Sequence, residues 1–161
     1  MTNERDAWRP VVAAFVSAVA LNFGWEMAQA RLYEPMGTVW EATRRCFVAS
    51  LGDGLMVLAV VAGGALLFRS VRWFVKPTLA EYAFAALTGL IFAVAIEMWG
   101  LGTGRWAYRV HMPRVPGTAV GAVPVLQMVI LTPLSLSLAG VWRSRRTKTP
   151  RSTERNADEQ H

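Results

Sequence analysis

The sequence has one cysteine and two histidines, and this scarcity excludes several kinds of site. Cys46 has no partner for an internal disulfide, and one thiolate cannot build a cysteine-based zinc site. The histidines, His111 and His161, are not spaced as a pair of zinc ligands. We expect no metal and no cofactor. His111 is the single candidate metal ligand, because an imidazole beside carboxylates suits zinc, iron or manganese.

Charged residues are also few, and their placement does not fit a nucleic-acid partner. Only 17% of the 161 residues are charged, whereas 53% are hydrophobic, and the mean hydropathy is +0.30. The net charge of +6 comes from short basic clusters between apolar runs, as juxtamembrane charges do. No basic face with interleaved aromatic residues forms. The composition therefore predicts an integral membrane protein with no nucleic-acid partner.

Four apolar runs are about as long as the 20 residues that cross a bilayer core as a helix. Thr78 and Glu81 ("TLAE") form a capping-box pattern that opens the third run. We therefore predict an all-α fold, a bundle of four transmembrane helices, in a multi-pass protein of the cell inner membrane. The predicted spans are residues 11–29, 46–68, 79–100 and 119–142.

Basic residues in the loops predict the orientation. Two Lys or Arg residues precede the first span, three separate the second and third spans, and six follow the fourth, whereas the other two loops hold six together. The positive-inside rule then places both termini in the cytoplasm. Residues 143–161 contain almost nothing apolar, so we expect a basic disordered tail after a transmembrane domain of residues 1–142.

The first span also imitates a cleavable secretory signal. Arg5 and Arg9 precede an apolar stretch that reaches the small-residue pattern "AQA" at residues 28–30. Glu26 and Gln29 are unusual beside a cleavage site, which favours a retained span. Both possibilities stay open at this point.

Polar residues interrupt the spans in a regular way. Asn22, Glu26 and Gln29 in "LNFGWEMAQARLY" follow each other at i, i+4 and i+7, which places them on one helix face. At about 1.5 Å of rise per residue, the polar residues of the other three spans reach the same outer half of the bundle. We therefore expect one polar pocket there. The residues from the other spans are Asp53, Glu97 and Gln127.

Three carboxyl groups in one apolar layer need an explanation. A charged side chain near the centre of a transmembrane helix costs about 2.5–3.5 kcal/mol, and three close carboxylates cannot all ionise comfortably. One of Glu26, Asp53 and Glu97, the candidate catalytic residues, is thus expected to hold a proton and act as a general acid. Arg105 is expected to pair with another. The alternative is that the polar stripe only joins the helices by hydrogen bonds.

The loop between the third and fourth spans would lie above this pocket. Its Trp106 and Tyr108 are typical interface anchors, and together with two prolines they resemble a lid. The candidate substrate-binding residues are Asn22, Trp25, Gln29, Trp99, Arg105, Trp106, Tyr108 and Gln127.

Three stretches, "NFGWEMAQARLY", "ASLGDGLMVLA" and "GRWAYRVHMPRVPGTAVGAVPVLQM", resemble a group of small four-span bacterial integral membrane proteins of unknown function. More loosely, "EMWGLGTGRWAY" followed by "VPVLQM" resembles membrane carotenoid hydratases, and "NFGWE" is similar to the Trp-Glu of integral-membrane terpene cyclases. The hydratase pattern has a Phe-Gly before its tyrosine, where Arg105, Trp106 and Ala107 stand here. The looser resemblance implies that Glu97 and Glu26 match acids that protonate an isoprenoid.

These patterns favour a membrane protein that binds or acts on a lipophilic, isoprenoid- or carotenoid-like molecule by proton donation. As an enzyme it would be a cyclase- or hydratase-like lyase or isomerase, in which Trp25, Trp99 and Trp106 steady a carbocation. Two alternatives stay open: a small ion- or proton-coupled transporter, and a non-catalytic accessory subunit of a membrane complex. The expected partners are membrane lipid or a lipophilic small molecule, with a homo-oligomer or a larger membrane complex possible.

Overall fold

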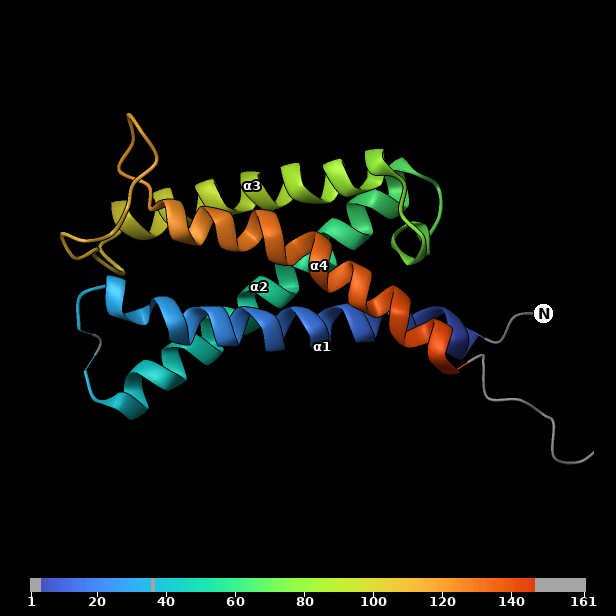
Figure 1. The fold of residues 1–161 in the computed structure, drawn as a ribbon, viewed down its shortest axis with the longest axis horizontal. Coiled ribbons are helices and arrows are strands. Elements are labelled where there is room, and N and C mark those ends of the chain that lie inside the picture. Colours follow the sequence, from blue (N-terminus) through green and yellow to red (C-terminus); the bar gives the residue numbers. More distant parts are fainter. Residues whose placement is uncertain (1–3, 36, 147–161) are drawn as a thin grey trace, which may run out of the picture.

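Four long antiparallel helices make up the fold (Figure 1). The structure, a computed structural model, describes residues 4–35 and 37–146. Within these residues it contains helices and no extended strand, which confirms the all-α prediction. The elements are α1 (Glu4–Gln29), η1 (Ala30–Leu32), α2 (Val39–Leu67), η2 (Trp73–Val75), α3 (Leu79–Gly102) and α4 (Ala122–Arg146).

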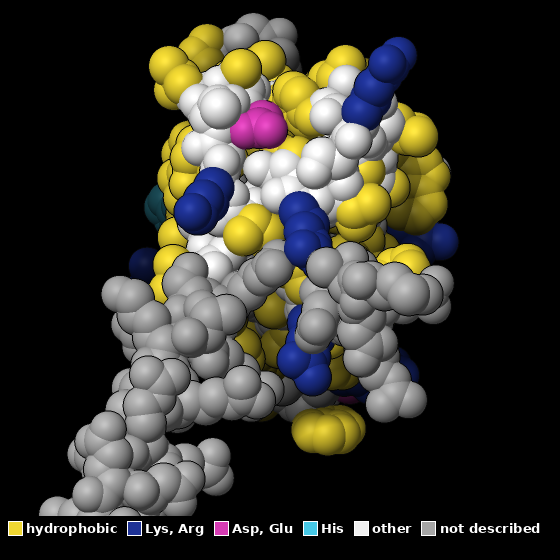
Figure 2. All heavy atoms as spheres, turned by 90° about the vertical axis from the view of Figure 1, so that its right-hand side faces the viewer, with side chains coloured by type: hydrophobic (Ala, Val, Ile, Leu, Met, Phe, Trp, Pro, Cys, Tyr) yellow, Lys and Arg dark blue, Asp and Glu magenta, His cyan; other side chains and the backbone are white. Residues whose placement is uncertain are grey.

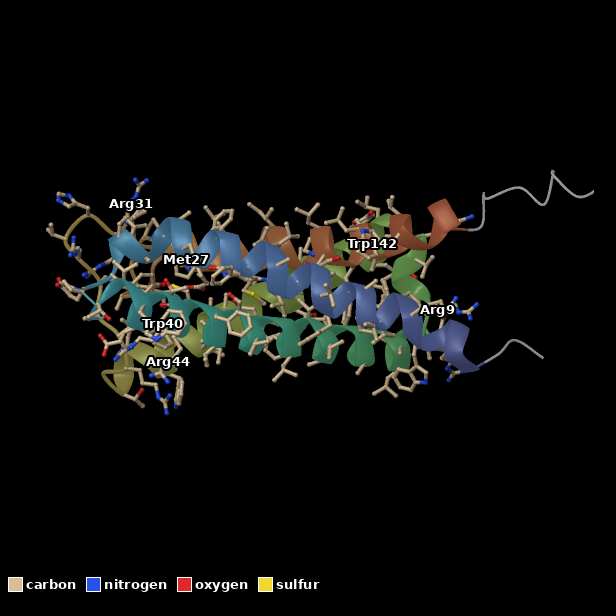
Figure 3. The ribbon with its side chains drawn as sticks, turned by 90° about the horizontal axis from the view of Figure 1, so that it is seen from below. Arg9, Met27, Arg31, Trp40, Arg44 and Trp142 are labelled. Carbon is tan, nitrogen blue, oxygen red and sulfur yellow. The ribbon has the colours of Figure 1, made fainter. Side chains whose placement is uncertain are left out.

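All four long helices are long and apolar enough to cross a membrane, which confirms the predicted multi-pass membrane protein. Exposed tryptophans lie at both ends of the bundle, as in the aromatic belts of membrane proteins. Trp8 near the start of α1 and Trp142 near the end of α4 are at one end, and Trp40 near the start of α2 and Trp99 near the end of α3 are at the other. Figure 3 labels Trp142 and Trp40. Between these ends the large exposed side chains are apolar and include Val16, Leu55, Leu87, Ile91 and Ile130.

Both described chain ends lie at the same end of the bundle, which we call the termini end (Figure 1). The segments that join α1 to α2 and α3 to α4 lie at the opposite end, the loop end. Figure 2 looks onto the termini end and shows several basic side chains there. Residues 147–161, most of the predicted tail, lie outside the described residues, and α4 continues to Arg146.

The helices do not pack evenly around the bundle. Helix α1 packs along α2 and α4, and α4 packs along α3, whereas α2 and α3 touch only sparsely. Figure 1 shows α2 crossing α1 and α3 obliquely, so that its first turns lie apart from the end of α3. The bundle is therefore least closed between α2 and α3 at the loop end.

Helix α2 begins seven residues earlier than the predicted span at Cys46. The cause is a capping box in "TVWE", where the Glu41 amide donates to Thr38 Oγ1 at 3.3 Å and the Thr38 amide donates to Glu41 Oε2 at 2.7 Å. The predicted capping box of Thr78 and Glu81 is present at the start of α3 and is confirmed. Both helices thus start with the same four-residue pattern.

The half of the bundle nearest the termini end has an apolar core. Trp73 and Phe74 of η2 insert between the helices and are buried beside Val57 and Leu136. The Trp73 indole donates to the Val61 carbonyl at 3.1 Å and lies directly on Gly64, where any side chain would collide with it. This packing closes the termini end, and the polar residues are concentrated in the other half.

Candidate functional site

The side-chain amide of Gln127 is the centre of the polar cluster. Its Nε2 atom donates toward Asn22 Oδ1 at 2.9 Å, Glu26 Oε1 at 3.1 Å and Asp53 Oδ2 at 3.2 Å. Its Oε1 atom accepts from Gln29 Nε2 at 2.7 Å. The structure thus brings α1, α2 and α4 together through one residue. The side chains of Asn22, Gln29, Asp53 and Gln127 are all buried.

The amide nitrogen of Gln127 has fewer hydrogens than the oxygens that surround it. An amide nitrogen carries two hydrogens, yet three oxygens surround Gln127 Nε2. Asn22 Nδ2 uses one of its hydrogens for the Ala18 carbonyl at 2.8 Å, and among the described residues it donates to no oxygen of the cluster. Buried polar groups are rarely left unpaired. A proton on Glu26 or Asp53 would supply a further donor here, and the predicted protonation of one acid stays a prediction.

Glu97 on α3 has a different environment. Its Oε2 atom accepts hydrogen bonds from Trp106 Nε1, at 3.2 Å, and from the Tyr108 hydroxyl. The Tyr108 oxygen in turn accepts from the Gly121 amide at 3.1 Å, at the start of α4. Two donors on one carboxyl oxygen fit its anionic form. The loop after α3 therefore holds Glu97 in place.

Tyr33, which is not among the predicted site residues, lies beside Tyr108. It is buried, and its ring lies 5.3 Å from the Tyr108 ring, centroid to centroid. Burial, and then the nearby carboxyls of Glu97, Glu26 and Asp53, raise the pKa of the Tyr33 phenol above its ordinary value. Helical spacing could not have found it, because α1 ends at Gln29 and Tyr33 is in extended backbone after η1.

Backbone hydrogen bonds join the two loops behind Tyr33 and Tyr108. The Glu34 amide donates to the Ala107 carbonyl and the Arg109 amide donates to the Leu32 carbonyl, both at 2.9 Å. The loop after α3 is thus fastened to the end of α1.

A cavity of about 620 Å³ lies against this cluster. The carboxyl-bearing residues Glu26, Asp53 and Glu97 all line it, together with Tyr33 and Gln127. Its remaining lining is mostly apolar and includes Met56, Ala93, Ile96, Pro124 and Met128. The combination of a few convergent polar groups with apolar walls is typical of small-molecule sites.

The predicted substrate-binding residues divide into two groups. Trp99, Arg105, Trp106 and Gln127 line the cavity. Asn22, Gln29 and Tyr108 are not among the lining residues, but each hydrogen-bonds to one that is. Trp25 also lies outside the lining, and its buried indole nitrogen has no hydrogen-bond partner among the described residues.

The contacts and the number of the basic residues at the cavity differ from the prediction. Arg105 places its guanidinium carbon 4.3 Å from the centre of the Trp99 ring, and the described residues show no ion pair between it and a carboxylate. Arg105 thus makes a cation–π contact with Trp99 in place of the predicted pairing. Arg44 and Arg45 on α2 also line the cavity. Both fall in a loop between the predicted spans, so they are not among the predicted site residues.

His111 is exposed in the loop after α3. Throughout the ranges 4–35 and 37–146, no group of three or more His, Cys, Asp and Glu side chains is arranged to hold a metal ion.

No protein-family model, curated protein or solved structure matches this chain. By its architecture the chain is a small four-helix membrane protein. The resemblance to carotenoid hydratases and terpene cyclases gains no support from these comparisons.

Proposed function

We propose that the protein binds a lipophilic molecule in the cavity and donates a proton to it from the pair Glu26 and Asp53. One observation carries this proposal: both carboxyls line the cavity while competing with Asn22 for the two hydrogens of the Gln127 amide. A carboxyl that holds a proton beside an apolar cavity is a general acid for a substrate that lacks polar groups of its own.

An isoprenoid olefin is the substrate class that fits this chemistry best. The O–H bond of the acid would break as a C–H bond forms at an alkene carbon, which leaves a carbocation and a carboxylate. Loss of a neighbouring proton to that carboxylate would complete an isomerisation or cyclisation, and attack by water would complete a hydration. In each case a proton returns to the carboxylate and restores the acid.

Glu97 has the second role in this proposal. Its two hydrogen-bond donors support an anion beside the cavity, where a negative charge stabilises a developing cation. Trp99 and Trp106 line the same space, and aromatic faces attract a cation at close range. The division assigns proton donation to Glu26 and Asp53 and charge stabilisation to Glu97.

A transporter remains the alternative, but the packing supports it less. Transport needs a polar route to the other side of the bundle. The termini-end half is instead filled by Trp73, Phe74 and the apolar residues around them. The accessory-subunit alternative predicts that no chemistry occurs at all, so a test of turnover separates it from the enzyme.

Deuterium incorporation tests the proposal. Purified protein in liposomes is incubated in D₂O with acyclic isoprenoid olefins such as farnesol and lycopene, and the lipids are analysed by high-resolution mass spectrometry. We expect carbon-bound deuterium with the wild type, and a loss of at least about 100-fold in Asp53→Asn or Glu26→Gln, in line with the usual contribution of a general acid.

The matched control is Glu34→Gln, which removes an exposed carboxyl at the same end of the bundle and outside the cavity lining. It should retain full incorporation. Equal incorporation in Asp53→Asn, Glu26→Gln and the wild type, or none in the wild type, would contradict proton donation by this pair.

A further inference from the structure

Three arginines surround the part of the cavity nearest the loop end. Arg44 and Arg45 belong to α2 and Arg105 follows α3, and all three line the cavity with exposed side chains. No salt bridge to a carboxylate is found for them among the described residues; Arg45 and Arg44 interact electrostatically with exposed Glu41, and Arg105 lies over the Trp99 ring. The acids lie deeper in the cavity, so the site has a cationic outer part and an acidic inner part.

The opening of the cavity lies between α2 and α3. Its exposed apolar lining residues are Val48 and Ala49 on α2, and Ile96 and Trp99 on α3. These are the two helices that touch only sparsely and diverge toward the loop end (Figure 1). Both are membrane-spanning helices, so the opening faces the bilayer sideways. A ligand would reach the cavity from within the membrane.

The arginines and the acids are separated along α2. Asp53 follows Arg45 by eight residues in the same helix, a rise of about 12 Å. A ligand whose polar group lies at the arginines would therefore place a distant part of its apolar chain beside Asp53. The two parts of the site fit the two ends of an amphiphile.

We propose that the ligand is a lipid with a phosphate or pyrophosphate headgroup, which Arg44, Arg45 and Arg105 bind at the opening between α2 and α3. Guanidinium groups bind phosphate oxygens in pairs and keep their charge at an interface. This inference rests on the proposed function and names its substrate class. The proton would then go to a carbon of the chain, and the headgroup would anchor the lipid without reacting.

Binding of matched probes tests this inference. Farnesyl phosphate, farnesol and inorganic phosphate are titrated against the full chain in mild detergent, with bound ligand counted by native mass spectrometry. We expect farnesyl phosphate to bind at least about tenfold more tightly than farnesol, because each charge-assisted hydrogen bond is worth roughly that factor. Inorganic phosphate alone should bind far more weakly, because it lacks the chain.

Variants identify the residues involved. The double variant Arg44→Gln/Arg45→Gln and the single variant Arg105→Gln should each weaken farnesyl phosphate binding about tenfold or more and leave farnesol binding unchanged. Arg31→Gln is the matched control, because Arg31 lies at the same end on the opposite side from Arg44 (Figure 3) and outside the cavity lining. Arg105→Lys, which keeps the charge, should retain part of the affinity.

Several outcomes would overturn the inference: equal binding of farnesyl phosphate and farnesol, an equal loss in Arg31→Gln, or inorganic phosphate binding as tightly as the lipid. The last would identify a site for soluble phosphate. Failure of the proposed function looks different. Arginine-dependent binding of farnesyl phosphate without deuterium incorporation would reject proton donation and keep the headgroup site. The exposed arginine variants are compared with the wild type by thermal unfolding, so that a loss of fold is detected separately.

Discussion

The side-chain amide of Gln29 on α1 donates to the side-chain carbonyl of Gln127 on α4, 2.7 Å away. This bond fixes which face of the Gln127 amide turns toward the acids, because an amide that accepts with its oxygen presents its nitrogen on the other side. The nitrogen is the atom that Asn22, Glu26 and Asp53 share. Gln29 thus orients the donor on which the candidate acids depend.

Replacement of Gln127 tests this network. Gln127→Leu keeps a side chain of similar size but removes the shared donor, and each buried polar group left unpaired costs about 1–3 kcal/mol. We expect a clear decrease in the free energy of unfolding, measured by denaturation in detergent. Leu126→Ala, a change at the exposed neighbour, is the control. Similar stabilities of the two variants would show that the network does not stabilise the fold.

Gly100 sets the position of Trp106. A Cβ atom at Gly100 would collide with the Trp106 ring, so Gly100→Ala should displace the indole and break its hydrogen bond to Glu97. We expect a destabilisation of about 1–3 kcal/mol, as for other overpacked sites, with a changed near-UV circular dichroism spectrum. Gly102→Ala, where nothing lies within 4 Å, should change neither. An unaltered spectrum in Gly100→Ala would contradict the close contact.

The raised pKa of Tyr33 predicts that the free energy of unfolding decreases at alkaline pH. An unfolded tyrosine has a pKa of about 10, and burial with three nearby carboxyls raises the pKa of Tyr33 in the fold. The neutral phenol is therefore favoured by folding. The contribution of the Tyr33 phenol to the free energy of unfolding is complete below a pH of about 10 and is lost as the pH rises above that value.

The free energy of unfolding is measured at about pH 8 and about pH 11 in the wild type and in Tyr33→Phe, on either side of the ordinary tyrosine pKa. The alkaline loss should be smaller in Tyr33→Phe, whereas Tyr82→Phe, which keeps Tyr33, should retain it. Equal losses in the wild type and Tyr33→Phe would show that the Tyr33 phenol does not titrate differently in the fold.

The proposed orientation places the termini end in the cytoplasm. In a Cys46→Ala background, Val110→Cys lies in the exposed loop after α3 and Val71→Cys lies exposed at the termini end. A membrane-impermeant maleimide should label Val110→Cys on intact cells and Val71→Cys only after permeabilisation. The reverse labelling pattern would show that the termini end lies outside the cell.

The sequence predicted the helices and most of the cluster because these depend on local rules. The lengths of the apolar runs predicted the four spans, and the i, i+4, i+7 spacing predicted the helix face that carries Asn22, Glu26 and Gln29. The antiparallel order then brought Asp53 and Gln127 to the same depth. The chemical roles of these residues stay predictions.

Other features depend on contacts that a single sequence does not encode. The tilted ring contact between Tyr33 and Tyr108 arises because two loops pair through their backbones, and no spacing rule relates residues so far apart. By contrast, the early start of α2 could have been predicted from the sequence, because "TVWE" has the same capping-box pattern as "TLAE". Missing it removed Arg44 and Arg45 from the predicted site.

The length of α2 relates the cavity to the thickness of the bilayer. Its 29 residues extend about 43 Å, whereas the hydrocarbon core of a bilayer is about 30 Å thick. The excess length is polar, because the first two turns of α2 carry Glu41, Arg44 and Arg45, and Figure 1 shows α2 lying obliquely to α1 and α3. A tilt that moves the first turns of α2 away from α3 is also what opens the cavity there. A thinner membrane, by increasing that tilt, would widen the opening, and distances between spin labels on α2 and α3 in lipids of different chain length would measure it. The oblique course of one helix would thus couple the width of the opening to the surrounding lipid.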